Sequence, residues 1–225
     1  MINIFARFFV IILIMKQYGV DITSRRLDDL DTLLLHDLEE YRNRTGDEVV
    51  VLDAGCGEGG LASVLLEAGY SVYGVDVMET EPAIFAGKKY DKGRFHNVDI
   101  RDFLAMEQGV TPYTAIVLQR VIHYMPYQTA VTVLKKCLEL SEYGVYVSFS
   151  GLGSEIAKYY VHKDVSIKNR FTVLSEMGQQ TFSITEPLCL YSEDDIQDLI
   201  TELDCRCEYF RTSAFGNHKC KLVRT

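Results

Sequence analysis

Short apolar runs alternate with amphipathic stretches along most of this 225-residue chain. The run at 49–52 holds three valines and a leucine, which is typical of a strand buried on both faces of a parallel sheet. Similar runs predict four more strands, at 71–76, 95–98, 114–119 and 146–150. Apolar residues at helical spacing lie between the strands, as in 61–68 and 130–138. This alternation predicts an α/β fold built on a parallel sheet.

The N-terminal part of the chain is the least typical. Residues 1–15 form an apolar extension whose longest apolar run is too short to span a bilayer as a helix. Two interpretations stay open: translation starts at Met15, or the extension is a helix that touches a membrane or caps the core. Leucines at helical spacing then predict a helix capped by Thr23 or Ser24. We expect residues 16–225 to form a single domain without stable membrane insertion.

Composition and charge narrow the class of partner. The formal net charge is −9 and the pI is near 5.1, so we expect no binding to DNA and no non-specific binding to an anionic membrane. The six cysteines form no CxxC pair, which indicates reduced thiols in a cytoplasmic protein. The sequence contains neither a metal-ligand pattern nor a serine–histidine–acid arrangement, so we expect no metal site.

The most informative stretch follows the first strand. Asp53 ends that strand, and the turn into the next helix contains glycines at 55, 57, 59 and 60. A strand, a glycine turn and a helix N-terminus form a socket for a nucleotide-like ligand. The carboxylates of Asp53 and Glu58 would repel a pyrophosphate, whereas they suit the ammonium and sulfonium of S-adenosylmethionine. The residues therefore favour S-adenosylmethionine over a dinucleotide.

The class I S-adenosylmethionine-dependent methyltransferases carry a motif I that closely resembles residues 51–59, VLDAGCGEG. The resemblance extends from about Arg25 to the C-terminus. It implies a doubly wound, seven-stranded Rossmann-like sheet in the order 3-2-1-4-5-7-6, with the last strand antiparallel. It also implies S-adenosylmethionine as the cofactor.

The resemblance assigns the cofactor site to four segments. Asp76 ends the second strand about 20 residues after the glycine turn begins, a spacing that suits a carboxylate bound to both ribose hydroxyls. In the family, apolar residues after this acid flank the adenine, and an acid after the third strand accepts from the adenine amino group. Asp102 is expected instead to cap the helix that follows. The implied cofactor-binding residues are Asp53, Ala54, Gly55, Cys56, Gly57, Gly59, Asp76, Val77, Met78, Asp99, Ile100, Gln119 and Arg120.

Two histidines are candidates for a catalytic general base. His123 follows an apolar pair after the fourth strand, at a place where family members frequently have histidine. It either packs against the glycine turn or touches the substrate. His218 lies at the expected tip of a hairpin with strands at 205–212 and 219–224, on the cofactor face. Either histidine could remove a proton from a hydroxyl or amine nucleophile.

Residues 151–182 exceed a minimal fold of this kind. In the family, an insertion at this place usually forms a lid over the substrate. Glycines at 151 and 153 are expected to act as its hinge. We expect aromatic residues at 159, 160 and 171 on its surface, together with basic residues that include Arg170 and attract an anionic substrate.

The implied reaction transfers the methyl group of S-adenosylmethionine to a substrate nucleophile, which depends on proximity and alignment more than on acid–base chemistry. A small molecule is the expected acceptor, and a protein or RNA target stays open. Two alternatives are kept: another reaction of the same cofactor, and a regulator that binds the cofactor without turnover.

Overall fold

The computed structural model describes residues 27–86, 91–107 and 113–225. The expectations for the extension 1–15, including a start at Met15, fall outside these ranges. Within them, no helix is both long enough and apolar enough to cross a membrane.

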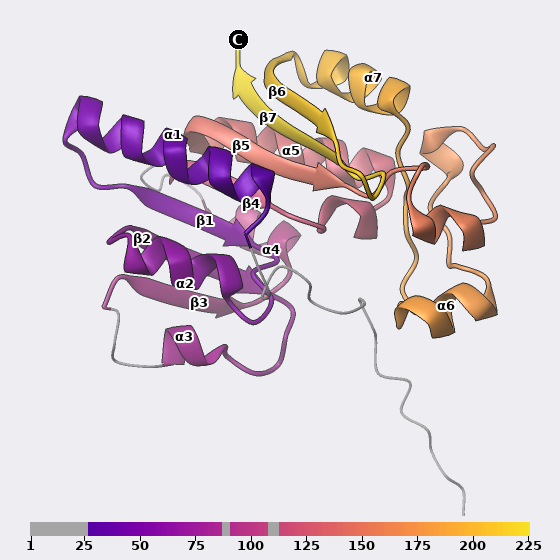
Figure 1. Ribbon diagram of the computed structural model, residues 1–225, viewed down its shortest axis with the longest axis horizontal. Coiled ribbons are helices and arrows are strands. Elements are labelled where there is room, and N and C mark those ends of the chain that lie inside the picture. The colour runs from indigo at the N-terminus through magenta and orange to yellow at the C-terminus, as the bar shows by residue number, and fades with distance from the viewer. Residues whose placement is uncertain (1–26, 87–90, 108–112) are drawn as a thin grey trace, which may run out of the picture.

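A seven-stranded sheet forms the centre of the molecule (Figure 1). Its strands are β1 (Val50–Ala54), β2 (Ser71–Asp76), β3 (Gly93–Asn97), β4 (Tyr113–Leu118), β5 (Ser141–Phe149), β6 (Cys205–Thr212) and β7 (His218–Arg224). The order is β3-β2-β1-β4-β5-β7-β6. β7 is antiparallel to both of its neighbours, and the other pairings are parallel. The predicted fold and strand order are confirmed.

Helices cover both faces of the sheet. Those on one face are α1 (Asp29–Thr45), α2 (Gly60–Glu67) and α3 (Ala83–Ala86), and those on the other are α4 (Ile100–Met106), α5 (Tyr127–Leu140) and α7 (Glu193–Leu203). The first group packs through an apolar cluster that includes Leu34 and Leu65. The second packs through a cluster that includes Leu134 and Leu199. Amphipathic helices thus bury the apolar stripes that their sequences predict.

Two helix caps differ from the prediction. Asp28 caps α1 and accepts hydrogen bonds from two backbone N–H groups of the first turn, so the cap expected at residue 23 or 24 is wrong. Asp99, and not Asp102, caps α4. In both helices another aspartate satisfies the free N–H groups, which any aspartate at the first position can do. Ser192 caps α7, as predicted.

Buried ion pairs fix α1 across β5 and β7. The ammonium of Lys221 lies 2.9 Å from a carboxylate oxygen of Asp37, which also accepts a hydrogen bond of 2.6 Å from the hydroxyl of Tyr146. Nearer the start of the helix, Lys219 pairs with Asp28 at 2.7 Å. Both lysines are buried, so each charge depends on its carboxylate partner. These pairs determine where the first turn of α1 lies.

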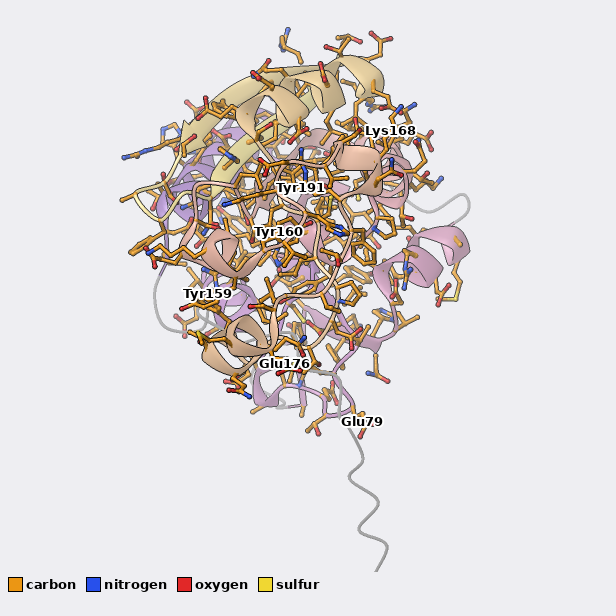
Figure 2. The ribbon with its side chains drawn as sticks, turned by 90° about the vertical axis from the view of Figure 1, so that its right-hand side faces the viewer. Glu79, Tyr159, Tyr160, Lys168, Glu176 and Tyr191 are labelled. Atoms are coloured by element: carbon orange, nitrogen blue, oxygen red, sulfur yellow. The ribbon has the colours of Figure 1, made fainter. Side chains whose placement is uncertain are left out.

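The segment between β5 and α7 lies beyond the carboxyl ends of the strands, at the right of Figure 1 and toward the viewer in Figure 2. We call residues 151–191 the insertion. It contains η3 (Glu155–Tyr159), η4 (Ile167–Asn169) and α6 (Glu176–Phe182). It also has an apolar cluster of its own, formed by Ala157, Tyr160, Leu174, Ile184, Leu188 and Leu190. The insertion is therefore a packed unit at the edge of the sheet where a ligand is expected.

The start of the insertion is a point of close packing. A Cβ atom on Gly151 would lie 2.0 Å from the carbonyl oxygen of Gly216 and 2.7 Å from Nε2 of His218. Gly151 also forms a β-bridge with Tyr191. The tip of the β6–β7 hairpin thus rests on Gly151. This contact explains the glycine at 151 without the hinge that the sequence led us to expect.

Arg170 and Tyr160 are buried, so the expectation that they lie on the surface is wrong. The guanidinium of Arg170 pairs with Asp195 of α7 at 2.5 Å and donates to the carbonyl oxygen of Leu190 at 2.8 Å. The hydroxyl of Tyr160 donates to the carbonyl oxygen of Leu188 at 2.9 Å. Composition alone does not distinguish a buried ion pair from a surface charge. The pair with Asp195 fastens the insertion to α7, and the other two contacts lie within the insertion.

We predict that Asp195→Ala lowers the free energy of unfolding by about 3–5 kcal/mol, because it leaves the buried guanidinium of Arg170 without its carboxylate partner. Glu155→Ala is the matched control, since it breaks an exposed ion pair with Lys158 of 2.6 Å and should cost less than about 1 kcal/mol. Chemical denaturation measures both. Equal losses would show that the Arg170–Asp195 pair does not anchor the insertion.

Candidate functional site

The candidate site lies between β1 and β4, at the carboxyl end of the sheet. From β1 the chain continues through β2 to β3 on one side, whereas β4 leads to β5 on the other. The strand order thus reverses between β1 and β4, which pair with each other in parallel. In sheets of this kind, ligands bind in the crevice at this reversal point. The turn after β1 and the segment after β4 frame that crevice.

The turn after β1 requires glycine for two reasons. Gly55, Gly57 and Gly59 have φ angles of +74°, +50° and +81°, which are strained for residues that carry a Cβ atom. Gly55 also lies against the segment after β4, because a Cβ atom there would be 2.2 Å from Cγ2 of Val121. The backbone of this turn can therefore lie close to a ligand in the crevice.

Asp76 ties the glycine turn to the end of β2. One carboxylate oxygen accepts a hydrogen bond of 2.9 Å from the N–H of Gly57, and the other accepts one of 3.1 Å from the N–H of Met78. Each oxygen keeps a second lone pair for a ligand hydroxyl. Val77, next in the chain, is 45% exposed. The carboxylate predicted to bind the ribose is therefore also part of the turn's own support.

Asp31, which the sequence did not indicate, lies where α1 meets the end of β4. Nε2 of Gln119 donates a hydrogen bond to Oδ1 of Asp31. Asp31 is 3% exposed, and burial, together with the charge of Asp28, raises the pKa of its carboxyl to about 6. Asp53 is the penultimate residue of β1, which pairs with β4, and it is 4% exposed. The only available sequence signal was the capping box, in which Asp31 stands three residues after Asp28.

Arg120 holds the chain in an unusual conformation directly after β4. Its φ is +58°, which is rare for a residue other than glycine. Its backbone N–H donates a hydrogen bond of 3.0 Å to Oγ of Ser148 on β5. Such a conformation costs about 1–3 kcal/mol and persists only where the surroundings impose it. The path of the chain beside the crevice is therefore fixed by β5.

The third segment predicted to bind the cofactor begins α4. The side chain of Asp99 caps the helix and also pairs with the guanidinium of Arg101 at 2.6 Å. Ile100 is buried, as are Ala54 and Cys56 beside the glycine turn. The Asp99 carboxylate is thus engaged with its own helix.

Both candidate histidines are buried. His123 is 4% exposed, and burial, reinforced by the charge of Arg120, lowers its pKa to about 3. Its Nδ1 lies 3.3 Å from Oγ of Ser150. His218 begins β7, with Nδ1 3.0 Å from Oγ1 of Thr212, and burial lowers its pKa as well. Both rings are therefore neutral at pH 7 and engaged with neighbouring segments.

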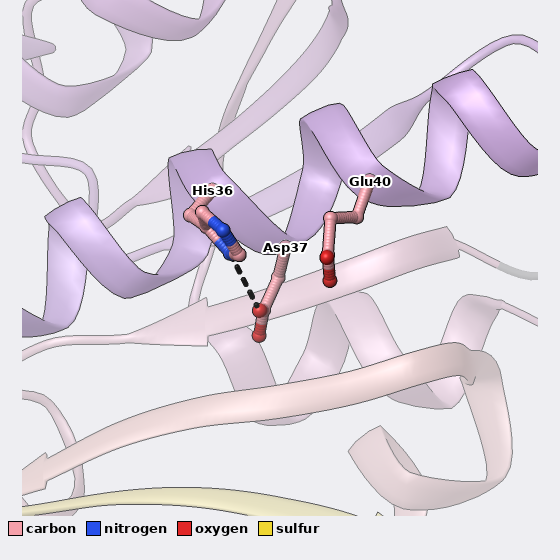
Figure 3. Close-up of side chains that lie close together, drawn as sticks. All are labelled: His36, Asp37 and Glu40. Atoms are coloured by element: carbon pink, nitrogen blue, oxygen red, sulfur yellow. Dashed lines mark ion pairs between the residues drawn. The ribbon is translucent and has the colours of Figure 1, made fainter.

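One cluster of potential metal ligands occurs in the described part of the chain, on α1 (Figure 3). It consists of His36, Asp37 and Glu40, whose ligand atoms lie within 4.8 Å of one another. Asp37 already pairs with Lys221 and with the hydroxyl of Tyr146. The cluster is thus explained by the docking of α1, and it lies outside the crevice.

The acceptor groups of the crevice suit a cationic ligand with hydroxyl groups. Asp31 and Asp53 bring two carboxyl groups to the neighbouring ends of α1 and β1. Asp76 offers lone pairs to hydroxyl groups at the end of β2. S-adenosylmethionine has an ammonium, a sulfonium and a ribose, whereas a phosphate would meet like charge here. The residues present therefore fit that cofactor.

Residues 51–144 match a family model described as a methyltransferase domain. This match is consistent with the class I S-adenosylmethionine-dependent methyltransferases. None of the curated proteins matches it in sequence.

Solved methyltransferases have a similar fold. Magnesium protoporphyrin IX methyltransferase from Synechocystis PCC 6803, with bound S-adenosylhomocysteine, has a TM-score of 0.56 and 17% identity, over 87% of this chain and 83% of that chain. The 1,6-didemethyltoxoflavin-N1-methyltransferase of Burkholderia thailandensis has a TM-score of 0.58 and 16% identity, over 89% and 76%. An O-methyltransferase from neocarzinostatin biosynthesis has a TM-score of 0.51 and 18% identity, over 87% and 57%.

The range that matches the methyltransferase family includes every predicted cofactor residue, from Asp53 to Arg120, and also His123. It does not include Asp31 or His218. The contacts of α1 and of the β6–β7 hairpin therefore lie outside the range that matches the family model.

We predict that Gly55→Ala destabilises the protein by about 2–4 kcal/mol, through backbone strain together with the clash against Val121. Gly69→Ala is the matched control, because Gly69 has a φ of +84° but no atom within 4 Å of the added methyl group. It should show the strain alone, about 1–2 kcal/mol. Val121→Ala should restore part of the stability to Gly55→Ala. Equal effects of the two glycine substitutions in thermal denaturation would contradict the close approach.

Proposed function

We propose that this protein is a methyltransferase that transfers the methyl group of S-adenosylmethionine to a nucleophile of a small molecule. The observation that carries the proposal is the crevice between β1 and β4, where a glycine turn, the Asp76 carboxylate and the end of β4 meet. When bound there, the cofactor supplies an electrophilic methyl group on its sulfonium. The protein's task is then to align the acceptor with that methyl group and to exclude water.

Each part of the cofactor is bound by a different segment of the fold. The backbone from Asp53 to Gly59 faces the amino-acid part, and Gln119 and Arg120 face it from the segment that follows β4. Asp76 binds the ribose hydroxyls. Val77 and Met78 flank the adenine on one side, and Ile100 flanks it on the other. The backbone at Asp99, more than its engaged carboxylate, meets the adenine edge.

His123 and His218 act mainly by holding the segments around the acceptor. Each is buried and contacts a hydroxyl group on a neighbouring segment, Ser150 or Thr212. A base is needed only where the acceptor's nucleophile must lose a proton during transfer. Either neutral imidazole would then serve only if the acceptor reaches it.

Apolar side chains exposed at the edge of the sheet where the insertion lies support a small, partly apolar acceptor. The insertion and the hairpin tip expose large apolar side chains, namely Val161, Val173, Met177 and Phe215. Solved methyltransferases of similar fold are named for magnesium protoporphyrin IX and 1,6-didemethyltoxoflavin, or hold 1,4-dihydroxy-2-naphthoic acid. We propose that the insertion covers the acceptor, with Tyr159 and α6 on the side seen in Figure 2.

The function is tested with methyl-labelled S-adenosylmethionine and a lysate separated into small molecules, RNA and protein. We expect label to enter the small-molecule fraction as S-adenosylhomocysteine is formed. Label in RNA or protein would contradict the proposed acceptor class. Absence of S-adenosylhomocysteine with every fraction would contradict turnover.

We predict that S-adenosylhomocysteine at about 100 times its dissociation constant stabilises the protein by about 2.7 kcal/mol, a rise in Tm of about 5–10 °C. NAD at the same concentration should produce no rise, because its pyrophosphate would meet the acids of the crevice. Thermal-shift measurements make the comparison. Stabilisation by NAD alone would overturn the assignment of the cofactor.

We predict that Asp76→Ala weakens S-adenosylhomocysteine binding by about 1.5–3 kcal/mol, because two ribose hydroxyls lose a charged acceptor. The exposed Asp47, which precedes β1 at the opposite edge of the sheet, provides the control, since Asp47→Ala removes the same charge away from the glycine turn. Calorimetry measures both affinities. An unchanged affinity in Asp76→Ala would exclude this carboxylate from the cofactor site.

A further inference from the structure

The first turn of α1 and the end of β4 are joined by one side-chain contact at the crevice. Nε2 of Gln119 donates to Oδ1 of Asp31 across 88 positions of sequence. The other oxygen of Asp31, Oδ2, accepts a hydrogen bond of 2.8 Å from the backbone N–H of Asp28. Both carboxylate oxygens are thus engaged, in a side chain that is almost fully buried.

Helix capping explains only half of this arrangement. The capping box needs Oδ2 of Asp31 for the backbone N–H of Asp28, and such a carboxylate normally lies at the surface of a helix end. Burial of the residue and the contact with Gln119 are not required by the cap. Burying a carboxylate is unfavourable unless its hydrogen bonds are made, so the Gln119 amide is a necessary partner.

The contact also determines which way the Gln119 amide points. An ionised carboxylate only accepts hydrogen bonds, so the NH₂ end of the amide must face Asp31 and its Oε1 must face away. Among the residues that the structure describes, none donates a hydrogen bond to Oε1 of Gln119. The amide oxygen is therefore held at the reversal point of the sheet with its lone pairs available to a ligand.

We propose that Asp31 is a positioning residue, which orients the amide of Gln119 so that its oxygen accepts a hydrogen bond from the ammonium group of the cofactor. This inference rests on the proposed placement of the cofactor between β1 and β4. Gln119 touches the ammonium, and Asp31 acts through Gln119. The negative charge of Asp31 behind the amide adds to the attraction for a cation.

The arrangement is sensitive to protonation of Asp31. Burial and the neighbouring Asp28 carboxylate raise its pKa to about 6, while the Gln119 contact and the charge of Lys219 on β7 oppose the rise. Above that pH the carboxylate is ionised and orients the amide as described. As the pH falls through about 6, the neutral acid acquires a proton that it can donate to Oε1, which turns the amide over. Recognition of the ammonium is then lost.

The test compares two ligands by calorimetry: S-adenosylhomocysteine, and methylthioadenosine, which has the same nucleoside and sulfur but no amino-acid part. In Asp31→Asn, the new amide no longer dictates the orientation of Gln119. We expect about tenfold or weaker binding of S-adenosylhomocysteine, and binding of methylthioadenosine within about twofold of the wild type.

Two further variants separate positioning from general damage to α1. Glu39→Gln removes an exposed carboxylate of the same helix, and it should leave both affinities unchanged. Gln119→Ala leaves the capping box intact and should reproduce the selective loss, so the inference stays testable if Asp31→Asn folds poorly. In the wild type, the affinity ratio of the two ligands should fall between pH 7.5 and 5.5, and in Asp31→Asn it should not change with pH.

Equal losses for both ligands in Asp31→Asn, or an unchanged affinity for S-adenosylhomocysteine in Gln119→Ala, would overturn the positioning role. A ratio in the wild type that does not change with pH would do the same. If the wild-type protein binds neither ligand, the proposed cofactor placement fails, which is a different result from the loss of selectivity tested here.

Discussion

The ion pairs between α1 and β7 are the constraint on which the geometry of the site depends. Lys219 and Lys221 are buried in the sheet, and an unpaired ammonium there would cost several kcal/mol. Asp28 and Asp37 of the helix region provide the opposite charges, 2.7 Å and 2.9 Å away. Because the two pairs lie more than two turns apart along the helix, they fix both its place and its rotation. Asp31 reaches the crevice as a consequence.

The strand β7 transmits this constraint to the other side of the site. Successive side chains of a strand point to opposite faces, so Lys219 and Lys221 face α1 while Cys220 joins the core beneath α5 and α7. At the start of the same strand, His218 lies against Gly151, where the insertion begins. A single antiparallel strand therefore contacts both the helix and the insertion that flank the crevice. This explains why the hairpin tip leaves no room for a side chain at 151.

Much of the fold was predictable because its signals are local. Buried runs such as 71–76 and the glycine turn at 55–59 are contiguous in sequence, and the strand order followed from the resemblance that the turn carries. What the sequence concealed is long-range. The buried state of Arg170 depends on Asp195, which is distant in sequence, and the role of Asp31 depends on Gln119. The sequence does not show whether a charged residue is solvated or paired, so only the three-dimensional arrangement distinguishes the two cases.

The acidic side chains of the crevice suit a ligand that carries positive charge. Asp31 and Asp53 are both nearly buried, and burial raises the pKa of the Asp31 carboxyl to about 6. A ligand that brings positive charge removes that cost as it binds, whereas a neutral nucleoside does not. Neutral residues at these positions would stabilise the empty fold. They would also remove the negative charge that favours a cationic cofactor. The same reasoning applies to Arg120, whose strained backbone is held by Ser148 beside the crevice. Both features favour binding and alignment of ligands over maximal stability of the empty fold.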